Sequence, residues 1–340
     1  MQSRLLSVQN LKTYFHTRKG IVRAVDGVSF NLYGNHSVGL VGETGSGKSM
    51  TAFSIMRLLP TKTARIVEGS VYFQPKDSEL LELTKLAAFG SEMRSFRGKE
   101  IALIFQDSLS ALNPVYTIGF QISENILHNT DLSRKEARER AVALLAEVGI
   151  NAPKKRVKQF PHELSGGMRQ RALIALALSA QPRILIADEP TTALDVTVEA
   201  QILKLISDLQ KSNKMGLILI THDMGVIAQT VDDVLVMYMG DMVEYGNVHT
   251  IFENPKHPYT IKLLESIIKL GSRGKQLKAI EGVIPDPLTL NPGCKFFSRC
   301  PWRKKSCEFE EPQLIETDPA HYVKCILCTG EEIGAEGSGS

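Results

Sequence analysis

A glycine-rich stretch in the first quarter of the chain has residue types that bind phosphate. From Gly42 to Ser49 it fits the spacing G-x-x-x-x-G-K-S, after the apolar run Ser37–Val41. Glycines let backbone N–H groups wrap around an anion, and a helix N-terminus adds a favourable dipole. We therefore expect Lys48 to reach nucleotide phosphates and Ser49 to coordinate Mg²⁺. The predicted contacts are Gly42, Glu43, Thr44, Gly45, Ser46, Gly47, Lys48, Ser49 and Met50.

A pair of carboxylates ends another apolar run. Asp188 and Glu189 directly follow Ile184–Ala187. Such a pair is common and carries little information alone, but downstream of a phosphate-binding loop it is informative. The position predicts that Asp188 enters the Mg²⁺ shell and that Glu189 acts as general base on the attacking water.

All five cysteines lie near the C-terminus. Their spacing is C-x₅-C-x₆-C-x₁₇-C, with a fifth cysteine two residues beyond the fourth. Four thiolates suit a tetrahedral Zn²⁺ or an iron–sulfur cluster, and ordinary buried thiols are the alternative. Apart from the last pair, the spacing lacks the C-x₂-C knuckles usual in zinc ribbons. The cysteines are Cys294, Cys300, Cys307, Cys325 and Cys328.

Composition narrows the classes of protein. The net charge of +3 over 340 residues is too small to indicate a nucleic-acid binder, so the basic cluster at residues 154–156 is interpreted as solvated surface. There is no run of about 18 apolar residues and no secretory signal at the start. We expect a cytoplasmic protein that reaches a membrane only through a partner.

Short apolar runs alternate with helical patterns through the first 250 residues, which predicts an α/β fold with buried strands. A helix is expected after Ser133, because Ser133 and Glu136 form a capping box. Its buried face should hold Ala137, Ala141, Leu144, Leu145 and Val148. Prolines recur after His249, which predicts an irregular extension, and the small, acidic stretch Gly330–Ser340 is expected to be disordered.

The segment from Leu164 to Gln170, LSGGMRQ, resembles the signature motif of ATP-binding-cassette (ABC) ATPases. Further markers of that family follow the same order along residues 1 to about 250. Gln106 resembles the Q-loop glutamine that senses Mg²⁺, Ala193-Leu194-Asp195 the D-loop, and His222 the switch histidine. Phe15 occupies the place of an aromatic residue that stacks on adenine, with Tyr14 as the alternative.

The resemblance implies a P-loop ATPase core with a parallel sheet, an N-terminal antiparallel β subdomain and a helical subdomain at about 107–180. In this family two cassettes close head to tail, and each signature motif completes the partner's site. One chain carries one set of motifs, so a second cassette is required. The residues expected in trans are Ser165, Gly166, Gly167 and Asp195, and the expected catalytic residues are Glu189, His222, Gln106 and Lys48.

Three segments resemble those of peptide/nickel-type importer ATPases: Ala24–Phe30, Asn254–Thr260 and Gly293–Pro301. The resemblance implies an ATPase subunit on the cytoplasmic face of the membrane that powers import of oligopeptides or dipeptides. It also implies a second, related ATPase chain, two permease subunits and an extracytoplasmic binding protein. A nickel or other small-solute importer is the alternative. A soluble nucleic-acid-remodelling ATPase is disfavoured by the near-neutral charge and the missing coiled coil.

The resemblance further implies that Cys294, Cys300, Cys307 and Cys325 bind a [4Fe–4S] cluster, with Zn²⁺ as the alternative and Cys328 as the spare thiol. The expected organisation is an ATPase domain over residues 1–250, an extension with this metal site over 251–328, and a tail over 329–340.

Overall fold

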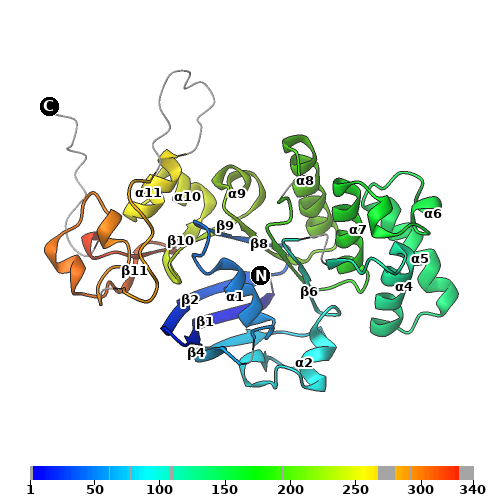
Figure 1. Ribbon diagram of the computed structural model, residues 1–340, viewed down its shortest axis with the longest axis horizontal. Coiled ribbons are helices and arrows are strands. Elements are labelled where there is room, and N and C mark those ends of the chain that lie inside the picture. Colours follow the sequence, from blue (N-terminus) through cyan, green and yellow to red (C-terminus); the bar gives the residue numbers. More distant parts are fainter. Residues whose placement is uncertain are drawn as a thin grey trace.

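The computed structural model describes residues 3–60, 62–76, 78–107, 111–192, 194–266, 280–290 and 292–328 (Figure 1). The tail expected at 329–340 therefore lies outside the described residues. The strands are β1 (Arg4–Thr17), β2 (Gly20–Tyr33), β3 (Ser37–Val41), β4 (Ala64–Phe73), β5 (Leu81–Glu82), β6 (Ile101–Ile104), β7 (Ile184–Asp188), β8 (Gly216–Thr221), β9 (Asp233–Tyr238), β10 (Asp241–Asn247), β11 (Leu314–Asp318) and β12 (His321–Lys324).

The α-helices are mostly short. They are α1 (Lys48–Ile55), α2 (Ser91–Phe96), α4 (Ile118–Asn129), α5 (Arg134–Glu147), α6 (Pro153–Arg156), α7 (Gly166–Leu178), α8 (Val196–Ser212), α9 (Met224–Thr230), α10 (Val248–Glu253) and α11 (Pro258–Glu265). Single 3₁₀ turns occur at Leu83–Lys85, Pro161–Glu163, Phe297–Arg299, Lys305–Glu308 and Ile326–Cys328.

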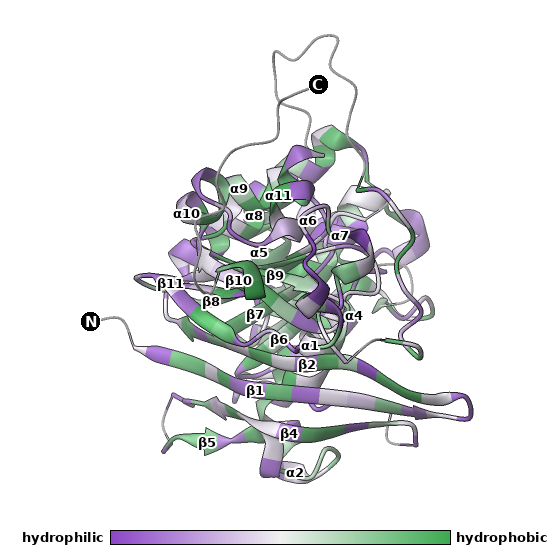
Figure 2. Ribbon diagram, turned by 90° about the vertical axis from the view of Figure 1, so that its left-hand side faces the viewer, coloured by the Kyte–Doolittle hydropathy of each residue, from purple (hydrophilic) through white to green (hydrophobic). Residues whose placement is uncertain are grey.

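Two sheets form the framework. The smaller is antiparallel in the order β2-β1-β4-β5, which confirms the expected N-terminal β subdomain. The larger has the order β11-β12-β10-β9-β3-β8-β7-β6, and its strands from β9 to β6 are parallel. In the side view β1 and β2 run as long ribbons beneath the large sheet, with β4 and β5 below them (Figure 2).

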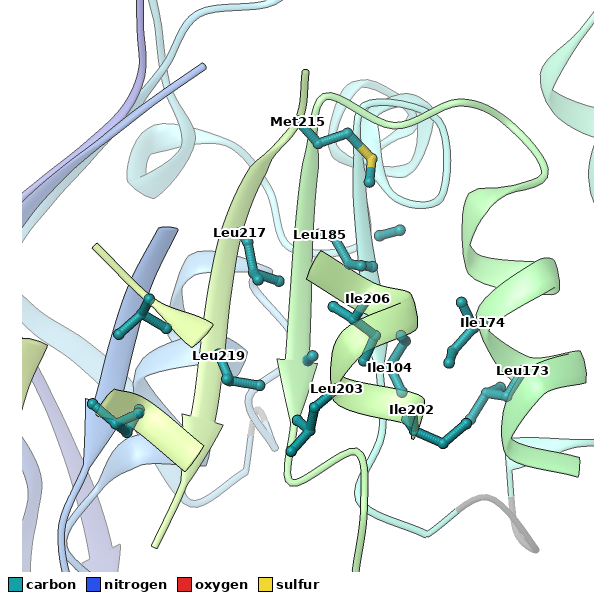
Figure 3. Close-up of a cluster of buried hydrophobic side chains, with 14 of the residues drawn as sticks. Ile104, Leu173, Ile174, Leu185, Ile202, Leu203, Ile206, Met215, Leu217 and Leu219 are labelled. Atoms are coloured by element: carbon teal, nitrogen blue, oxygen red, sulfur yellow. The ribbon is translucent and has the colours of Figure 1, made fainter. Parts of the chain in front are cut away.

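The predicted buried strands are present because they are apolar on both faces. Along β7, Leu185 and Ala187 belong to the core under the helices, whereas Ile184 and Ile186 belong to the core shared with the small sheet. Figure 3 shows Ile202, Leu203 and Ile206 of α8 lying over the first of these faces. The large sheet is therefore covered on both sides.

The helices α4, α5, α6 and α7 gather at one end of the molecule (Figure 1). The predicted capping box is present: the Ser133 hydroxyl accepts from the Glu136 N–H, and the Glu136 carboxylate accepts from the Ser133 N–H. The expected apolar face of α5 is buried throughout.

The C-terminal extension lies at the opposite end (Figure 1). It is more regular than its prolines indicated, because β11 and β12 form a hairpin that pairs with β10 and enlarges the main sheet. Phe296 is 1% exposed and packs on Tyr238 and Tyr259. The sequence reading missed the hairpin because its strands are short and polar. Within the described residues, no helix has the length and apolar character needed to cross a membrane.

Candidate functional site

Four predicted site segments meet where parallel strands of the large sheet end. The glycine-rich loop follows β3, Gln106 follows β6, Glu189 follows β7, and His222 follows β8. These four strands are neighbours in the sheet, and ligands of open α/β sheets bind beyond the carboxyl ends of the strands. The topology therefore brings together residues that are up to 180 positions apart in the chain, from Gly42 to His222.

The phosphate-binding loop requires glycine at two positions. Gly42 has φ +151° and Gly47 has φ +104°, conformations that other residues rarely adopt. A Cβ at Gly42 would lie 2.1 Å from the Met237 carbonyl oxygen, and one at Gly47 would lie 2.2 Å from that of Ala24. The loop is thus clamped between β2 and β9 by backbone contacts.

Lys48 points back into this loop. Its ammonium group donates to the Gly42 carbonyl at 2.7 Å and to the Glu43 carbonyl at 3.1 Å. Burial lowers the pKa of Lys48, and the carboxylates of Glu189 and Asp188 partly oppose that shift. Because its partners are neutral carbonyls, the ammonium group is available to an incoming anion.

Ser49 and Asp188 lie side by side, as expected for a shared metal ion. The Ser49 hydroxyl donates to Asp188 Oδ1 at 3.0 Å. Burial raises the pKa of Asp188, against the hydrogen bond from Ser49. A hydroxyl and a carboxylate oxygen are the kind of ligands that Mg²⁺ prefers.

Glu189 is the centre of a hydrogen-bond network. Its carboxylate accepts from Gln106 Nε2 at 2.7 Å and from the Thr192 hydroxyl at 3.0 Å, and it lies 3.2 Å from His222 Nδ1. Burial raises the pKa of Glu189, but the His222 and Thr192 hydrogen bonds and the charges of His222 and Lys48 outweigh it and leave the pKa below its usual value. Glu189 is therefore ionised at neutral pH.

Several of these residues border a cavity of about 520 Å³, whereas Gly42, Glu43, Asp188 and Thr192 do not line it. Its walls include the predicted loop from Thr44 to Met50, together with Gln106, Glu189 and His222. Other lining residues were not predicted: Val22, Arg23, Ala24, Met239, Ile284 and Pro287. Nothing in their local sequence marks them, because they are ordinary residues of strand β2, a turn and the extension.

Several predicted residues are not on the cavity wall. Phe15 pairs with Val22 across β1 and β2 but does not line the cavity, and the hydroxyl of Tyr14 instead donates to Asp26. The adenine contact of Phe15, or of Tyr14 in its place, stays a prediction.

The signature motif also lies apart from the cavity. Ser165 caps α7 by accepting from the Met168 N–H, and Asp195 caps α8 by accepting from the Val198 N–H. Neither these residues nor Gly166 and Gly167 line the cavity. Ala193 of the expected D-loop lies outside the described residues.

Glu43 has an unexpected partner in the extension. The Arg299 guanidinium donates to both Glu43 carboxylate oxygens, at 2.7 and 3.0 Å, and the Glu43 N–H donates to the Tyr259 hydroxyl. This ion pair raises the pKa of Arg299. The first half of the phosphate-binding loop is therefore held by the extension.

The four cysteines predicted as ligands are close enough to influence one another. Burial raises the pKa of Cys294 to about 12, and the charges of Cys325, Cys300 and Cys307 add to that shift. Cys325 and Cys328 are free thiols that share a side-chain hydrogen bond. Among the described side chains, however, no group of three or more His, Cys, Asp or Glu is arranged to hold a metal ion.

Known proteins resemble the chain along almost its whole length. The ABC transporter family matches residues 25–192, and the family described as oligopeptide/dipeptide transporter, C-terminal region, matches residues 243–307. The oligopeptide transport ATP-binding protein AppD of Bacillus subtilis is 46% identical over 99% of this chain and 100% of that protein. The dipeptide transport ATP-binding protein DppD of the same organism is 48% identical over 95% of each chain.

Solved structures share the core. The dimeric bacterial ABC transporter cassette MJ0796 aligns with a TM-score of 0.62 at 25% identity, over 72% of this chain and 98% of that one. Its dimer bound to ADP and phosphate, in a post-hydrolysis state, gives the same values. The chain therefore belongs to the ABC transporter ATP-binding proteins that carry the oligopeptide/dipeptide C-terminal region, and it is an ATPase.

Proposed function

We propose that the 520 Å³ cavity binds Mg·ATP and that the chain hydrolyses it to power import of oligopeptides or dipeptides. One observation carries this proposal: the Glu189 carboxylate, already bonded to Gln106 and His222, faces the same cavity as the phosphate-binding loop. A general base and a phosphate-binding loop on one cavity are what hydrolysis of a phosphoanhydride requires.

In this site Lys48 and the loop N–H groups hold the phosphates, while Ser49 and Asp188 hold Mg²⁺. The metal ion would neutralise charge on the phosphate oxygens. Glu189 is ionised, so it can accept a proton from water, and Gln106, Thr192 and His222 keep its carboxylate oriented towards the cavity.

A second cassette is needed to complete the site. Ser165, Gly166 and Gly167 begin α7, where the helix dipole favours an anion, but they do not reach this chain's own cavity. The similarity to a dimeric cassette supports a head-to-tail arrangement in which they serve the partner's nucleotide.

Exchanging Glu189 for glutamine tests the assignment. Glu189→Gln removes the base and keeps nearly the same shape, so turnover should fall at least about 100-fold while ATP affinity stays near wild type. Phosphate release and calorimetric ATP binding measure the two quantities. Hydrolysis at a near wild-type rate would contradict the role of Glu189.

Import of peptides rests on the relatives named for oligopeptide and dipeptide transport and on the matching C-terminal region. The partners would be a related ATPase chain, two membrane permeases and an extracytoplasmic peptide-binding protein, with this chain at the cytoplasmic face of the membrane. Uptake of a labelled peptide into proteoliposomes holding the full complex tests this. Uptake of nickel without peptide would favour the alternative importer class.

The organisation proposed with this function is an ATPase domain over residues 1–250 and an extension over 251–328 that holds a [4Fe–4S] cluster, or else Zn²⁺. Support for the cluster comes from the donor chemistry of Cys294, Cys300, Cys307 and Cys325, since four cysteine thiolates are the usual ligands of such a cluster. When bound, a cluster would crosslink the extension.

Anaerobically purified protein should be brown, with broad absorbance and equal amounts of iron and sulfide. Cys294→Ser should remove the metal, and Cys328→Ser should not. A colourless protein with one zinc would favour Zn²⁺, and a protein with neither metal would contradict the site.

A further inference from the structure

The segment from residue 280 to residue 290 forms part of the cavity that holds the phosphate-binding loop. Ile284 and Pro287 line this cavity together with Val22 and the loop from Thr44 to Met50. Ile284 is 40% exposed. An apolar side chain held at the surface of the cavity that contains the phosphate-binding loop favours contact with a ligand that has an apolar part.

We propose that this segment is an outer wall of the nucleotide pocket and that Ile284 and Pro287 contact the nucleoside of the bound nucleotide. The inference rests on the proposed nucleotide site. It adds residues of the C-terminal extension to a site whose other residues all come from the first 250 positions.

The segment is fixed at both ends. Ile280 and Leu290 pack against the main core, and Leu288 lies against the tip of the β1–β2 hairpin, 3.3 Å from where a Cβ on Gly20 would be. Between them Asp286 makes a tight turn, since its carboxylate accepts from the Leu288 N–H at 2.9 Å and its carbonyl accepts from the Thr289 N–H at 3.0 Å. The wall is therefore pre-formed.

Arg299 ties the start of the wall to the phosphate-binding loop. While two of its nitrogens bind the Glu43 carboxylate, it also donates to the carbonyl oxygens of Glu281 at 3.1 Å and Ile280 at 3.3 Å. The Arg299 side chain is 3% exposed. Arg299 is thus a positioning residue: it fixes the distance between the wall and the loop that holds the phosphates.

The chemistry of the walls indicates which part of the nucleotide meets the segment. The phosphates are expected to contact Lys48 and the loop N–H groups, and the attacking water is expected to lie beside Glu189. The apolar side chains of Val22, Ile284 and Pro287 cannot donate hydrogen bonds to a phosphate. A purine and its ribose instead offer flat, weakly polar surface that these side chains can contact. These residues therefore suit the nucleoside.

Calorimetry with two ligands tests the wall. The double variant Ile284→Ala, Pro287→Ala should bind ATP about fivefold more weakly, because it loses apolar contact area with the nucleoside. Its affinity for inorganic tripolyphosphate, which has no nucleoside, should equal that of wild type. Val283→Ala is the matched control, since Val283 is 87% exposed and does not line the cavity, and it should leave both affinities unchanged.

Unchanged ATP affinity in the double variant would overturn the proposal. Equal weakening of both ligands would also overturn it, because the segment would then act through the phosphate-binding loop. Lys48→Ala tests the nucleotide site independently of the wall, because it should weaken the binding of both ATP and tripolyphosphate. If Lys48→Ala bound both ligands as tightly as wild type, the nucleotide site itself would be misassigned, and the wall would fall with it.

Discussion

The ATPase core and the C-terminal extension are stabilised in different ways. The core buries continuous apolar strands, such as β7 and β8, between helices on one face and a second sheet on the other. The extension adds apolar side chains such as Tyr259, Leu263 and Phe296 to the edge of that core and also contacts it through charged groups. Lys295 lies 3.0 Å from Asp26 and 2.9 Å from Asp241, and Arg299 holds Glu43.

Two of these charged contacts join the extension to residues near the nucleotide site. Asp26 lies on β2 close to the loop, and Glu43 lies within it. Substitutions in the extension should therefore perturb the phosphate-binding loop more than they perturb the helical end of the molecule. Three predictions compare the two regions, starting with the core.

The largest effect is expected for Ser165→Arg in the core. A long, charged side chain at the start of α7 should block closure on a partner cassette, so turnover should fall at least about 100-fold. ATP binding to the isolated chain should stay within about twofold of wild type, since Ser165 does not line the chain's own cavity.

Ser165→Ala is the control for bulk: it loses the cap on Met168, worth about 1 kcal/mol of stability, and the hydroxyl offered to the partner's nucleotide, but adds no long side chain, so turnover should fall less than in Ser165→Arg. If Ser165→Arg alone abolished ATP binding to the isolated chain, the division of the site between two cassettes would be wrong.

Sequence alone predicted the core well because its determinants are local. The phosphate-binding loop, the carboxylate pair and the strands before them are short motifs with fixed spacing, and the capping box at Ser133 was read from four residues. The contacts of the extension are not local: Arg299 and Glu43 are 256 positions apart, and Lys295 and Asp26 are 269 apart. The residues around a lysine or arginine in the sequence do not indicate which distant carboxylate it will pair with.

The same limit applies to the predicted adenine contact. The assignment of Phe15 comes from the resemblance to the ABC family and stays a prediction, because the face of β1 that a residue occupies depends on the register with β2. That pairing contains several register shifts between Arg4 and Tyr14, and each irregular position changes which face a residue occupies. The position of Phe15 along the strand therefore does not decide whether it contacts adenine.

The second prediction removes a charged contact of the extension. Lys295→Met should lower the free energy of unfolding by about 3 kcal/mol at pH 7, because Asp26 and Asp241, both more than 90% buried, lose a cation. Tyr14 still donates to Asp26 and Lys324 still pairs with Asp241, which limits the loss. Urea unfolding measures it.

Lys12→Met is the matched control. Lys12 pairs with Glu68 on the exposed surface of the small sheet, so its loss should cost less than about 1 kcal/mol.

Measuring the free energy of unfolding over a range of pH separates charge from packing at Lys295. Burial raises the pKa of Asp26, but Lys295 and Tyr14 outweigh it, so the net pKa is lowered and the stabilisation is lost as the pH falls through that lowered pKa. The difference between wild type and Lys295→Met should therefore narrow at acidic pH. If the difference in the free energy of unfolding stayed constant with pH, the effect of Lys295→Met would come from lost packing and not from the lost charge.

The smallest effect is expected for the pH dependence of hydrolysis in His222→Ala. In wild type the His222 hydrogen bond and charge help to keep the pKa of Glu189 below its usual value, against the effect of burial. Removing them should raise that pKa, so the base becomes protonated at a higher pH and the acidic limb of kcat moves upward. Saturating ATP separates this shift from binding. His222→Gln, which keeps a hydrogen-bond donor without the charge, should move the limb less. If both variants lost activity with an unmoved limb, His222 would act on something other than the carboxylate 3.2 Å away.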